Sequence, residues 1–162
     1  LTGLLNRRGL EENLSRTIAK AKRGGVSSLL YTDLDNFKDV NDTIGHSAGD
    51  EVLMILADLL KAALRTEDIV FRLGGDEFAV VTRETELGPA LSRLEGVVND
   101  ANQSGANPYL INYSVGEASA EAGSGMVSFA DLVNQADMLM YERKREKKAS
   151  RESESVNRSP GI

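Results

Sequence analysis

IVFRLGGDEFAVVT, residues 69–82, is the stretch of this sequence that is most informative about its fold. Two runs rich in β-branched and aromatic residues, 69–73 and 78–82, lie on either side of Gly74-Gly75. Such runs favour strands, and adjacent glycines accept the backbone angles that a tight turn requires. The stretch therefore predicts a β-hairpin, with Asp76 and Glu77 where its second strand begins.

Outside the hairpin, the spacing of apolar residues predicts helices and further strands. The predicted helices cover residues 7–22, 35–44, 47–64, 87–103 and 129–148, and the predicted strands cover 26–32 and 110–118. Gly24-Gly25 is expected to end the first helix, and Asp35 to cap the second, with Ile44 turned inward. Residues 47–50 resemble a capping box that would open the third helix.

This order of elements predicts an α/β (α+β) fold, in which a mixed central β-sheet is flanked by helices. The strand over 26–32 is short and almost continuously apolar, which is typical of a buried central strand. A chain of 162 residues suits one domain, and we expect it to cover residues 1–149. Residues 150–162 are polar, with Ser, Glu, Pro and Gly, and predict a disordered tail or linker.

Composition excludes several classes of protein. The absence of cysteine excludes a disulfide scaffold, a cysteine nucleophile and cysteine-ligated metal sites. No apolar run reaches the length of a membrane span and no signal peptide opens the chain, so we expect a cytoplasmic domain, within a parent protein that could be membrane-tethered. The net charge of −6 argues against nucleic acid as a partner, because nonspecific binding requires a basic surface.

Acidic residues at two places suggest a metal site. Asp33 and Asp35 follow the predicted central strand, and Asp76 and Glu77 follow the glycines of the hairpin. If the hairpin lies beside that strand, Asp33 and Asp76 could share one Mg²⁺ or Mn²⁺, for which carboxylates are suitable hard ligands. For Asp35 we favour a turn or helix-cap role, and acidic hairpin tips also occur as solvated turns.

Four polar residues after the central strand form a second candidate group: Lys38, Asn41, His46 and Asp50. Lys38 could neutralise phosphates, and the amide and carboxylate of Asn41 and Asp50 could read a guanine edge. The alternatives are a solvated face for Lys38, a helix cap for Asp50 and a local cap for His46. One histidine without cysteine cannot form a zinc centre.

Taken together, these motifs resemble the GGDEF domain family, the diguanylate cyclases. The matching segments are LTGLLNRR at 1–8, DLDNFKDVND at 33–42, GHSAGD at 45–50 and RLGGDEF at 72–78. The resemblance implies a fold like the palm of class III nucleotide cyclases and polymerases, with a ferredoxin-like core. It also implies a homodimer that condenses two GTP into cyclic di-GMP and releases two pyrophosphates. An acidic residue usually precedes Leu1, so we expect that the chain was cut at a domain boundary and that a sensory domain precedes it.

The resemblance also implies roles for individual residues. Asp33, Asp76 and the backbone carbonyl of Leu34 correspond to metal ligands. Asp76 also stands at the position of the family's proposed general base, Lys38 at that of the transition-state stabiliser, and Glu77 at a loop-supporting position. The substrate-binding positions are Asn41 and Asp50 for guanine, His46, the glycines Gly74 and Gly75, and two lysines near the C-terminus, Lys144 and Lys148.

Two further segments bear on regulation and affinity. Arg65-Thr66-Glu67-Asp68 matches the family's RxxD inhibitory site for the product, although an Arg-Asp pair at a helix end is also common in unrelated proteins. In the last helix Lys144 keeps a phosphate-contacting lysine, Lys148 replaces an arginine and Lys147 a glycine. A lysine lacks the planar fork of arginine, so triphosphate affinity could differ. A catalytically silent domain that senses GTP or cyclic di-GMP is the alternative function.

Overall fold

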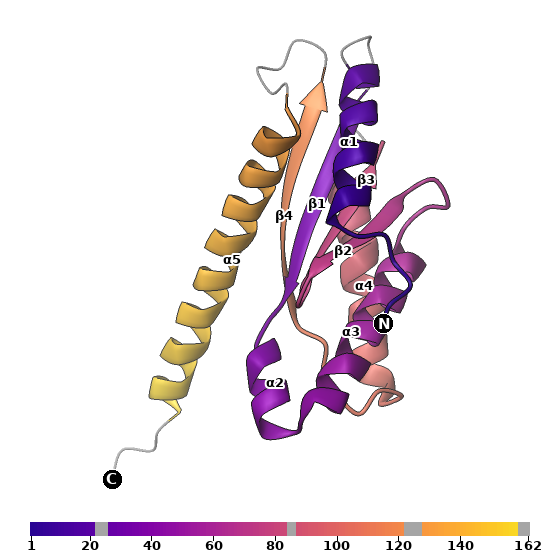
Figure 1. The fold of residues 1–162 in the computed structure, drawn as a ribbon. Helices are drawn as coiled ribbons and strands as arrows, with labels where there is room; N and C mark the ends of the chain where they lie inside the picture. Colours follow the sequence, from indigo (N-terminus) through magenta and orange to yellow (C-terminus); the bar gives the residue numbers. More distant parts are fainter. Residues whose placement is uncertain (22–25, 84–86, 122–127, 159–162) are drawn as a thin grey trace.

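A computed structural model of the chain describes residues 1–21, 26–83, 87–121 and 128–158. In chain order, its elements are α1 (Arg7–Ala21), β1 (Val26–Leu34), α2 (Phe37–Thr43), α3 (His46–Ala63), β2 (Ile69–Gly74), β3 (Glu77–Thr82), α4 (Gly88–Ser104), β4 (Tyr113–Glu121) and α5 (Phe129–Asn157). Figure 1 shows them as a sheet with helices on both sides. The glycines at 24 and 25, expected to end the first helix, lie outside the described residues.

The strands form a four-stranded sheet in the order β2-β3-β1-β4. β1 is central, pairs antiparallel with both β3 and β4, and is buried as its apolar sequence predicts. The expected α+β class and flanking helices are confirmed, and this order is that of a ferredoxin-like, split βαβ core. The expectation of a mixed sheet is corrected: each pairing between the named strands is antiparallel, because β3 lies between β1 and β2, which run in the same direction. Among the described residues, the isolated bridge between Leu5 and Phe71 is parallel.

Each face of the sheet has its own apolar core. On one face, α1 and α5 cover the sheet, and the buried residues there include Leu10, Leu14, Ile18, Tyr31, Phe71, Ala136 and Met140. On the other face, α3 and α4 cover it, and the buried residues there include Leu30, Leu34, Leu56, Leu60, Phe78 and Leu94. The helical spacing of these positions in the sequence is what allows each helix to bury one side.

The capping predictions for α2 and α3 are wrong. Asn36, in the left-handed region at φ 60°, stands at the N-cap of α2, and the Asp35 side chain is held elsewhere. α3 begins after Gly45, whose φ of 119° favours glycine, and no side chain caps it, so residues 47–50 form no capping box. Ile44 is 58% exposed rather than inward, because α2 ends before it.

The predicted ends of β4 and α5 also differ from the structure. β4 begins at Tyr113 rather than Leu110, because the Asn102 side-chain amide bonds both backbone groups of Ile111, at 2.8 and 2.9 Å. α5 continues to Asn157 instead of ending near residue 148. Its last turns are exposed and continue past the sheet (Figure 1), so part of the segment expected as a disordered tail is helical.

β4 and α5 pack with almost no space between their backbones. Gly116 of β4 faces the α5 backbone so closely that a Cβ atom built there would lie 3.0 Å from the Cα of Met140 and still nearer to the carbonyl oxygen of Ala136. On the same pair of elements, Arg143 Nη2 donates to Glu117 Oε1 at 2.8 Å and Arg143 Nη1 donates to the Val115 carbonyl at 2.8 Å. These contacts fix α5 along the strand.

Candidate functional site

The hairpin tip lies beside the carboxyl end of β1, as the sequence analysis required for a shared metal site. Asp33 is the register partner of Glu77, and the backbone N–H of Leu34 donates to the carbonyl of Asp76 at 3.3 Å. The register therefore brings together two acidic segments that are far apart in the chain. Both Asp33 and Asp76 are partly buried.

Asp33 is the most strongly perturbed carboxyl at this place. Burial, and next a side-chain hydrogen-bonding contact with Asp76, raise its pKa from 3.8 to about 7, while the Lys144 ammonium opposes the shift. Asp33 Oδ2 accepts from Lys144 Nζ at 2.6 Å, and the same ammonium donates to the Leu34 carbonyl at 3.1 Å. Asp33 Oδ1 is buried, and no donor among the described residues reaches it.

These oxygens are chemically suited to a divalent cation. Two carboxyl groups in contact need a proton or a cation between them, and Asp33 Oδ1 lacks a donor within the described structure. Asp33, Asp76 and the carbonyl of Leu34 supply only hard oxygen donors. The described residues hold no group of three or more His, Cys, Asp or Glu side chains suited to a metal. A two-carboxylate site of this kind fits Mg²⁺ that takes its other ligands from phosphates and water.

The turn before Asp76 is held by a side chain that the sequence analysis did not identify. Gly74 and Gly75 have φ angles of 153° and 48°, which favour glycine. Arg72 donates to the carbonyl of Gly75 from Nη2 at 2.9 Å and from Nε at 3.2 Å. Arg72 thus fixes the residue that precedes Asp76, and its position two residues before the glycines is the only signal in the sequence.

Glu77 lies on the same face of the sheet as Asp33 but contacts Tyr31. Burial is the main cause that raises the pKa of Tyr31, and the charge and hydrogen bond of Glu77 add to it. Opposed residues in an antiparallel pair share a face, so Glu77 supports the start of β3 from within the α1 and α5 layer. The loop-supporting role that the resemblance implied for Glu77 stays a prediction.

The second predicted group lies on α2 and on the first turns of α3. Lys38, His46 and Asp50 are exposed, and Asn41 is half-buried against Gly49. α2 follows β1 after two residues, so these side chains belong to the same end of the sheet as Asp33. The contact between Asn41 and Gly49 was not predicted, since Gly49 appeared only as part of a motif.

A basic pocket adjoins this end of β1. Its volume is about 340 Å³, and its lining is Asp35, Asn36, Tyr141, Lys144, Arg145, Lys147, Lys148 and Arg151. Five of these eight side chains are cationic, so the pocket suits a polyanion. Lys144 and Lys148, for which the resemblance implied phosphate contacts, both line it.

Lys147, which stands where the family has glycine, makes contacts of its own. Its ammonium donates to the Tyr113 carbonyl and to Asp35 Oδ2 at 3.4 Å. Asp35 also accepts from Ser114 Oγ at 2.7 Å. Asp35 therefore joins β1 to β4 and α5 rather than capping a helix, and Lys147 is accommodated without closing the pocket.

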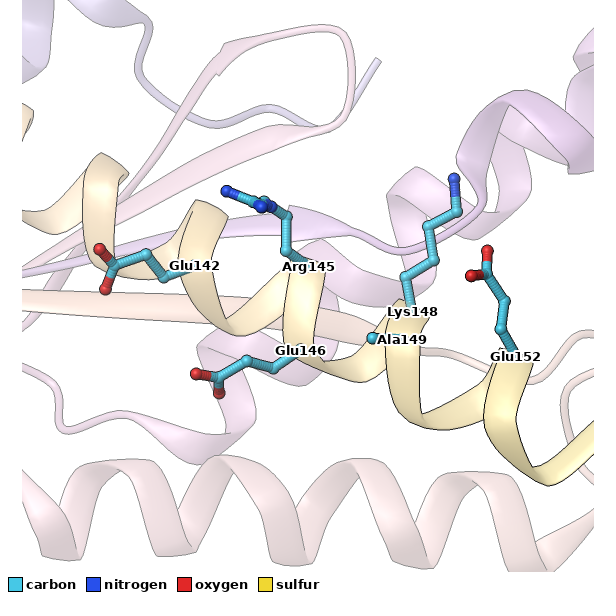
Figure 2. Close-up of a pocket in the computed structure, with 6 residues that line it drawn as sticks. All are labelled: Glu142, Arg145, Glu146, Lys148, Ala149 and Glu152. Atoms are coloured by element: carbon cyan, nitrogen blue, oxygen red, sulfur yellow. The ribbon is translucent and has the colours of Figure 1, made fainter.

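A neighbouring groove, of about 620 Å³, has a mixed charge. Figure 2 shows its six lining residues, all from α5: Glu142, Arg145, Glu146, Lys148, Ala149 and Glu152. Arg145 and Lys148 leave the helix on one side and Glu146 on the other (Figure 2). With three acids and two bases on one exposed helix, this groove indicates no particular ligand charge.

The Arg65 to Asp68 segment lies at the opposite end of β2 from the hairpin. Asp68 Oδ2 accepts from the backbone N–H of Arg65 at 2.9 Å, and both residues line a pocket of about 330 Å³. Asp68 Oδ1 is buried, and the described residues offer it no hydrogen bond. Arg65, Thr66 and Asp68 thus contribute to a pocket that is separate from the basic pocket beside Asp35.

Across the described ranges, no helix combines the length and the apolar character that crossing a bilayer demands.

Comparisons with known proteins give one consistent result. The family profile described as "Diguanylate cyclase, GGDEF domain" matches residues 1–150. The chain is 36% identical to diguanylate cyclase DgcS of Shewanella oneidensis over 146 residues. The matched segment covers 89% of this chain and 48% of DgcS. The chain therefore spans about half the length of DgcS. It is also 37% identical to diguanylate cyclase DosC of Escherichia coli, in a match that covers 90% of this chain and 32% of DosC.

Solved structures agree with the sequence comparison. The crystal structure of the GGDEF domain of YfiN (TpbB) from Pseudomonas aeruginosa superposes with a TM-score of 0.79 at 34% identity, covering 90% of this chain and 93% of that one. The GGDEF domain of DgcB from Caulobacter crescentus, solved in complex with c-di-GMP, gives a TM-score of 0.77 at 29% identity, covering 90% and 88%.

Proposed function

The chain belongs to the GGDEF domain family, and on that premise we propose that it is a diguanylate cyclase, which condenses two GTP into cyclic di-GMP and releases two pyrophosphates. The observation that carries the proposal is the contact between Asp33 and Asp76 beside the basic pocket of α5. Polyphosphate chemistry needs a place for a divalent cation next to a cationic surface, and this end of the sheet supplies both.

The metal would be held by Asp33, Asp76 and the carbonyl of Leu34. Mg²⁺ or Mn²⁺ bound there would neutralise triphosphate charge and polarise the phosphoryl oxygens. Lys144 and Lys148 bind the phosphates from α5, and Lys38 stabilises the charge that develops in the transition state. Gly74 and Gly75, without side chains, let the phosphates approach the hairpin backbone.

The remaining residues orient the nucleoside and move the proton. Asn41 and Asp50 bind the guanine edge, and His46 contacts the substrate from the start of α3. The 3′-hydroxyl oxygen of one GTP attacks the α-phosphorus of the other; a new P–O bond forms, the bond to pyrophosphate breaks and Asp76 accepts the hydroxyl proton. Two such transfers close the ring. Glu77, through Tyr31, keeps the start of β3 in place.

One incubation tests this function against its alternative. The chain, at high concentration with GTP and Mg²⁺, should form cyclic di-GMP that chromatography separates from GTP. A catalytically silent GGDEF domain that senses GTP or cyclic di-GMP would bind nucleotide by calorimetry and form no product. The replacement of the family's arginine by Lys148 favours this alternative, whereas the intact Asp33 and Asp76 pair favours the cyclase.

Catalysis should depend on two copies of the chain facing each other. One domain offers one group of phosphate- and guanine-binding residues, and the reaction needs two GTP aligned for mutual attack. We therefore expect the activity per mole of enzyme to fall in proportion to concentration once the protein is diluted below its dimerisation range. Activity would be measured with sedimentation on the same samples. A constant activity per mole in samples that contain only monomer would contradict this.

Product should inhibit the enzyme through the RxxD pocket. For Arg65→Ala we expect cyclic di-GMP to bind at least about tenfold more weakly, because a charge-assisted hydrogen bond to phosphate or guanine is lost. The initial rate should stay within about twofold, since the segment lies at the far end of β2. Calorimetry with cyclic di-GMP and progress curves check this, with the exposed Arg8→Ala as the matched control. Unchanged product binding in Arg65→Ala would reject the assignment.

The setting of the domain follows from its substrate. GTP is a cytoplasmic nucleotide, so we place the reaction in the cytoplasm. The catalytic unit in this proposal is residues 1–149, and residues 150–157 continue α5 beyond it.

A further inference from the structure

Gly49 is buried at the end of the first turn of α3, and the side chain of Asn41 lies directly on it. A Cβ atom built on Gly49 would lie 2.9 Å from Cγ of Asn41, 3.3 Å from its Nδ2 and still closer to its Oδ1. Real Cβ contacts are not this short, so any larger residue at position 49 must displace the Asn41 amide. The position of that amide therefore depends on the absence of a side chain at residue 49.

The backbone between the two helices brings Asn41 into this position. The N–H groups of Ile44 and Gly45 both donate to the carbonyl of Val40, at 2.9 and 3.3 Å, which closes α2 tightly. Gly45, at φ 119°, then reverses the chain, and the N–H of Gly49 donates to the Gly45 carbonyl at 3.2 Å. α2 thus folds back on the first turns of α3, and Asn41 lies on the residue that precedes Asp50.

Stability alone does not account for glycine at this position. Inside an 18-residue helix, glycine is less favourable than alanine, because it loses more conformational freedom on folding. The atoms that a Cβ would meet are the end of a flexible side chain, not backbone. Alanine should therefore leave the fold intact and turn Asn41 away.

We propose that Gly49 is a positioning residue for base recognition: it keeps the Asn41 amide where, beside Asp50, it selects guanine over adenine. The inference rests on the proposed function, since it takes Asn41 and Asp50 as the guanine-binding pair. Guanine and adenine differ in the donors and acceptors of the edge that such a pair reads. A displaced amide loses one hydrogen bond to guanine without affecting the phosphate contacts on α5.

The test is a calorimetric titration of the whole chain with GTP and with ATP in the presence of Mg²⁺. We expect Gly49→Ala to weaken GTP binding about tenfold, the effect of one lost hydrogen bond, and to leave ATP binding unchanged. The matched control is Gly96→Ala, in the interior of α4, where a Cβ would meet nothing within 4 Å, and it should change neither affinity. Equal loss for both nucleotides, or no loss for GTP, would overturn the inference.

A double variant separates positioning from a general effect on the fold. In Asn41→Ala the amide is already absent, so adding Gly49→Ala should cause no further loss of GTP affinity. Should Gly49→Ala alone fail to fold, the double variant decides: GTP affinity equal to that of Asn41→Ala supports the inference, and a further loss rejects it. Absence of GTP binding in the unmodified chain would instead reject the proposed function.

Discussion

Replacing Asp76 by asparagine should lower the rate of cyclic di-GMP formation by about a hundredfold or more. The variant removes one of the two carboxylates proposed to hold the cation and also the group proposed to accept the 3′-hydroxyl proton. Loss of one electrostatic element of an active site typically costs about 10²–10³ in rate. Asp33→Asn should have an effect of the same size, because it removes the other half of the pair.

The Asp76→Asn variant should still fold, and its free energy of unfolding should depend less on pH. The pKa of Asp33 is about 7 in the folded chain and 3.8 in the reference state. Between these values the native state holds a proton that the unfolded state has released, so this carboxyl makes the metal-free protein less stable as pH rises through that range. Without the charge and contact of Asp76, the pKa of Asp33 should fall, and the protein should lose less stability as pH rises.

Product chromatography and thermal unfolding at pH 5 and pH 8 measure these two effects. Asp58→Asn is the matched control, since Asp58 is exposed on α3, with Lys61 4.0 Å away, and α3 covers the face of the sheet opposite to that of Asp33. The control should keep its activity. An Asp76→Asn variant with the original turnover would remove the pair from the mechanism.

Gly116→Ala should be the most destabilising of the glycine substitutions considered for this chain. Its Cβ would collide with the backbone of α5 at Ala136 and Met140, which cannot rotate away as a side chain can. Overpacking typically costs about 1–3 kcal/mol, and a backbone clash in the sheet and helix contact belongs at the upper end, about 3 kcal/mol. Gly96→Ala, with open space around it, should instead be neutral or more stable by up to about 1 kcal/mol.

Denaturant unfolding compares the two alanine variants. A second effect is expected below the unfolding transition: because α5 carries Lys144, separating α5 from β4 should also weaken GTP binding and lower turnover. Equal stability of Gly116→Ala and Gly96→Ala would show that α5 can move away from β4 at little cost. That result would contradict the prediction based on their close packing.

The sheet and its covering helices could be predicted from local sequence pattern. Leu10, Leu14 and Ile18 recur at helical spacing and are buried, and the hairpin formed around Gly74-Gly75 as its composition required. Helix ends were less predictable. A turn or helix cap was expected for the Asp35 side chain, whereas it accepts from Ser114, a contact that only the pairing of β1 with β4 creates.

Part of the site could also be predicted from local sequence pattern. The apolar pattern indicates the strand that carries Asp33 and the hairpin that carries Asp76, but their adjacency depends on the pairing of β1 with β3, which the sequence left as a condition. The ion pair of Lys144 with Asp33 joins residues at opposite ends of the chain and depends on how α5 packs, which no local pattern encodes. Two further contacts could not be predicted from the sequence, because both depend on backbone geometry at a turn. These are the hydrogen bonds from Arg72 to the Gly75 carbonyl and the packing of Asn41 against Gly49.

The pairing of Asp33 with Glu77 makes the acidic site sensitive to the length of two strands. Side chains alternate between the two faces of a strand, so inserting or deleting a single residue within β1, even several positions before Asp33, would turn Asp33 toward α3 and α4. The same change within β3 would shift its register and remove Glu77 from its place opposite Asp33. Such a change would touch no functional residue and yet abolish activity. Length variation among natural or engineered versions of this chain should therefore be confined to its loops.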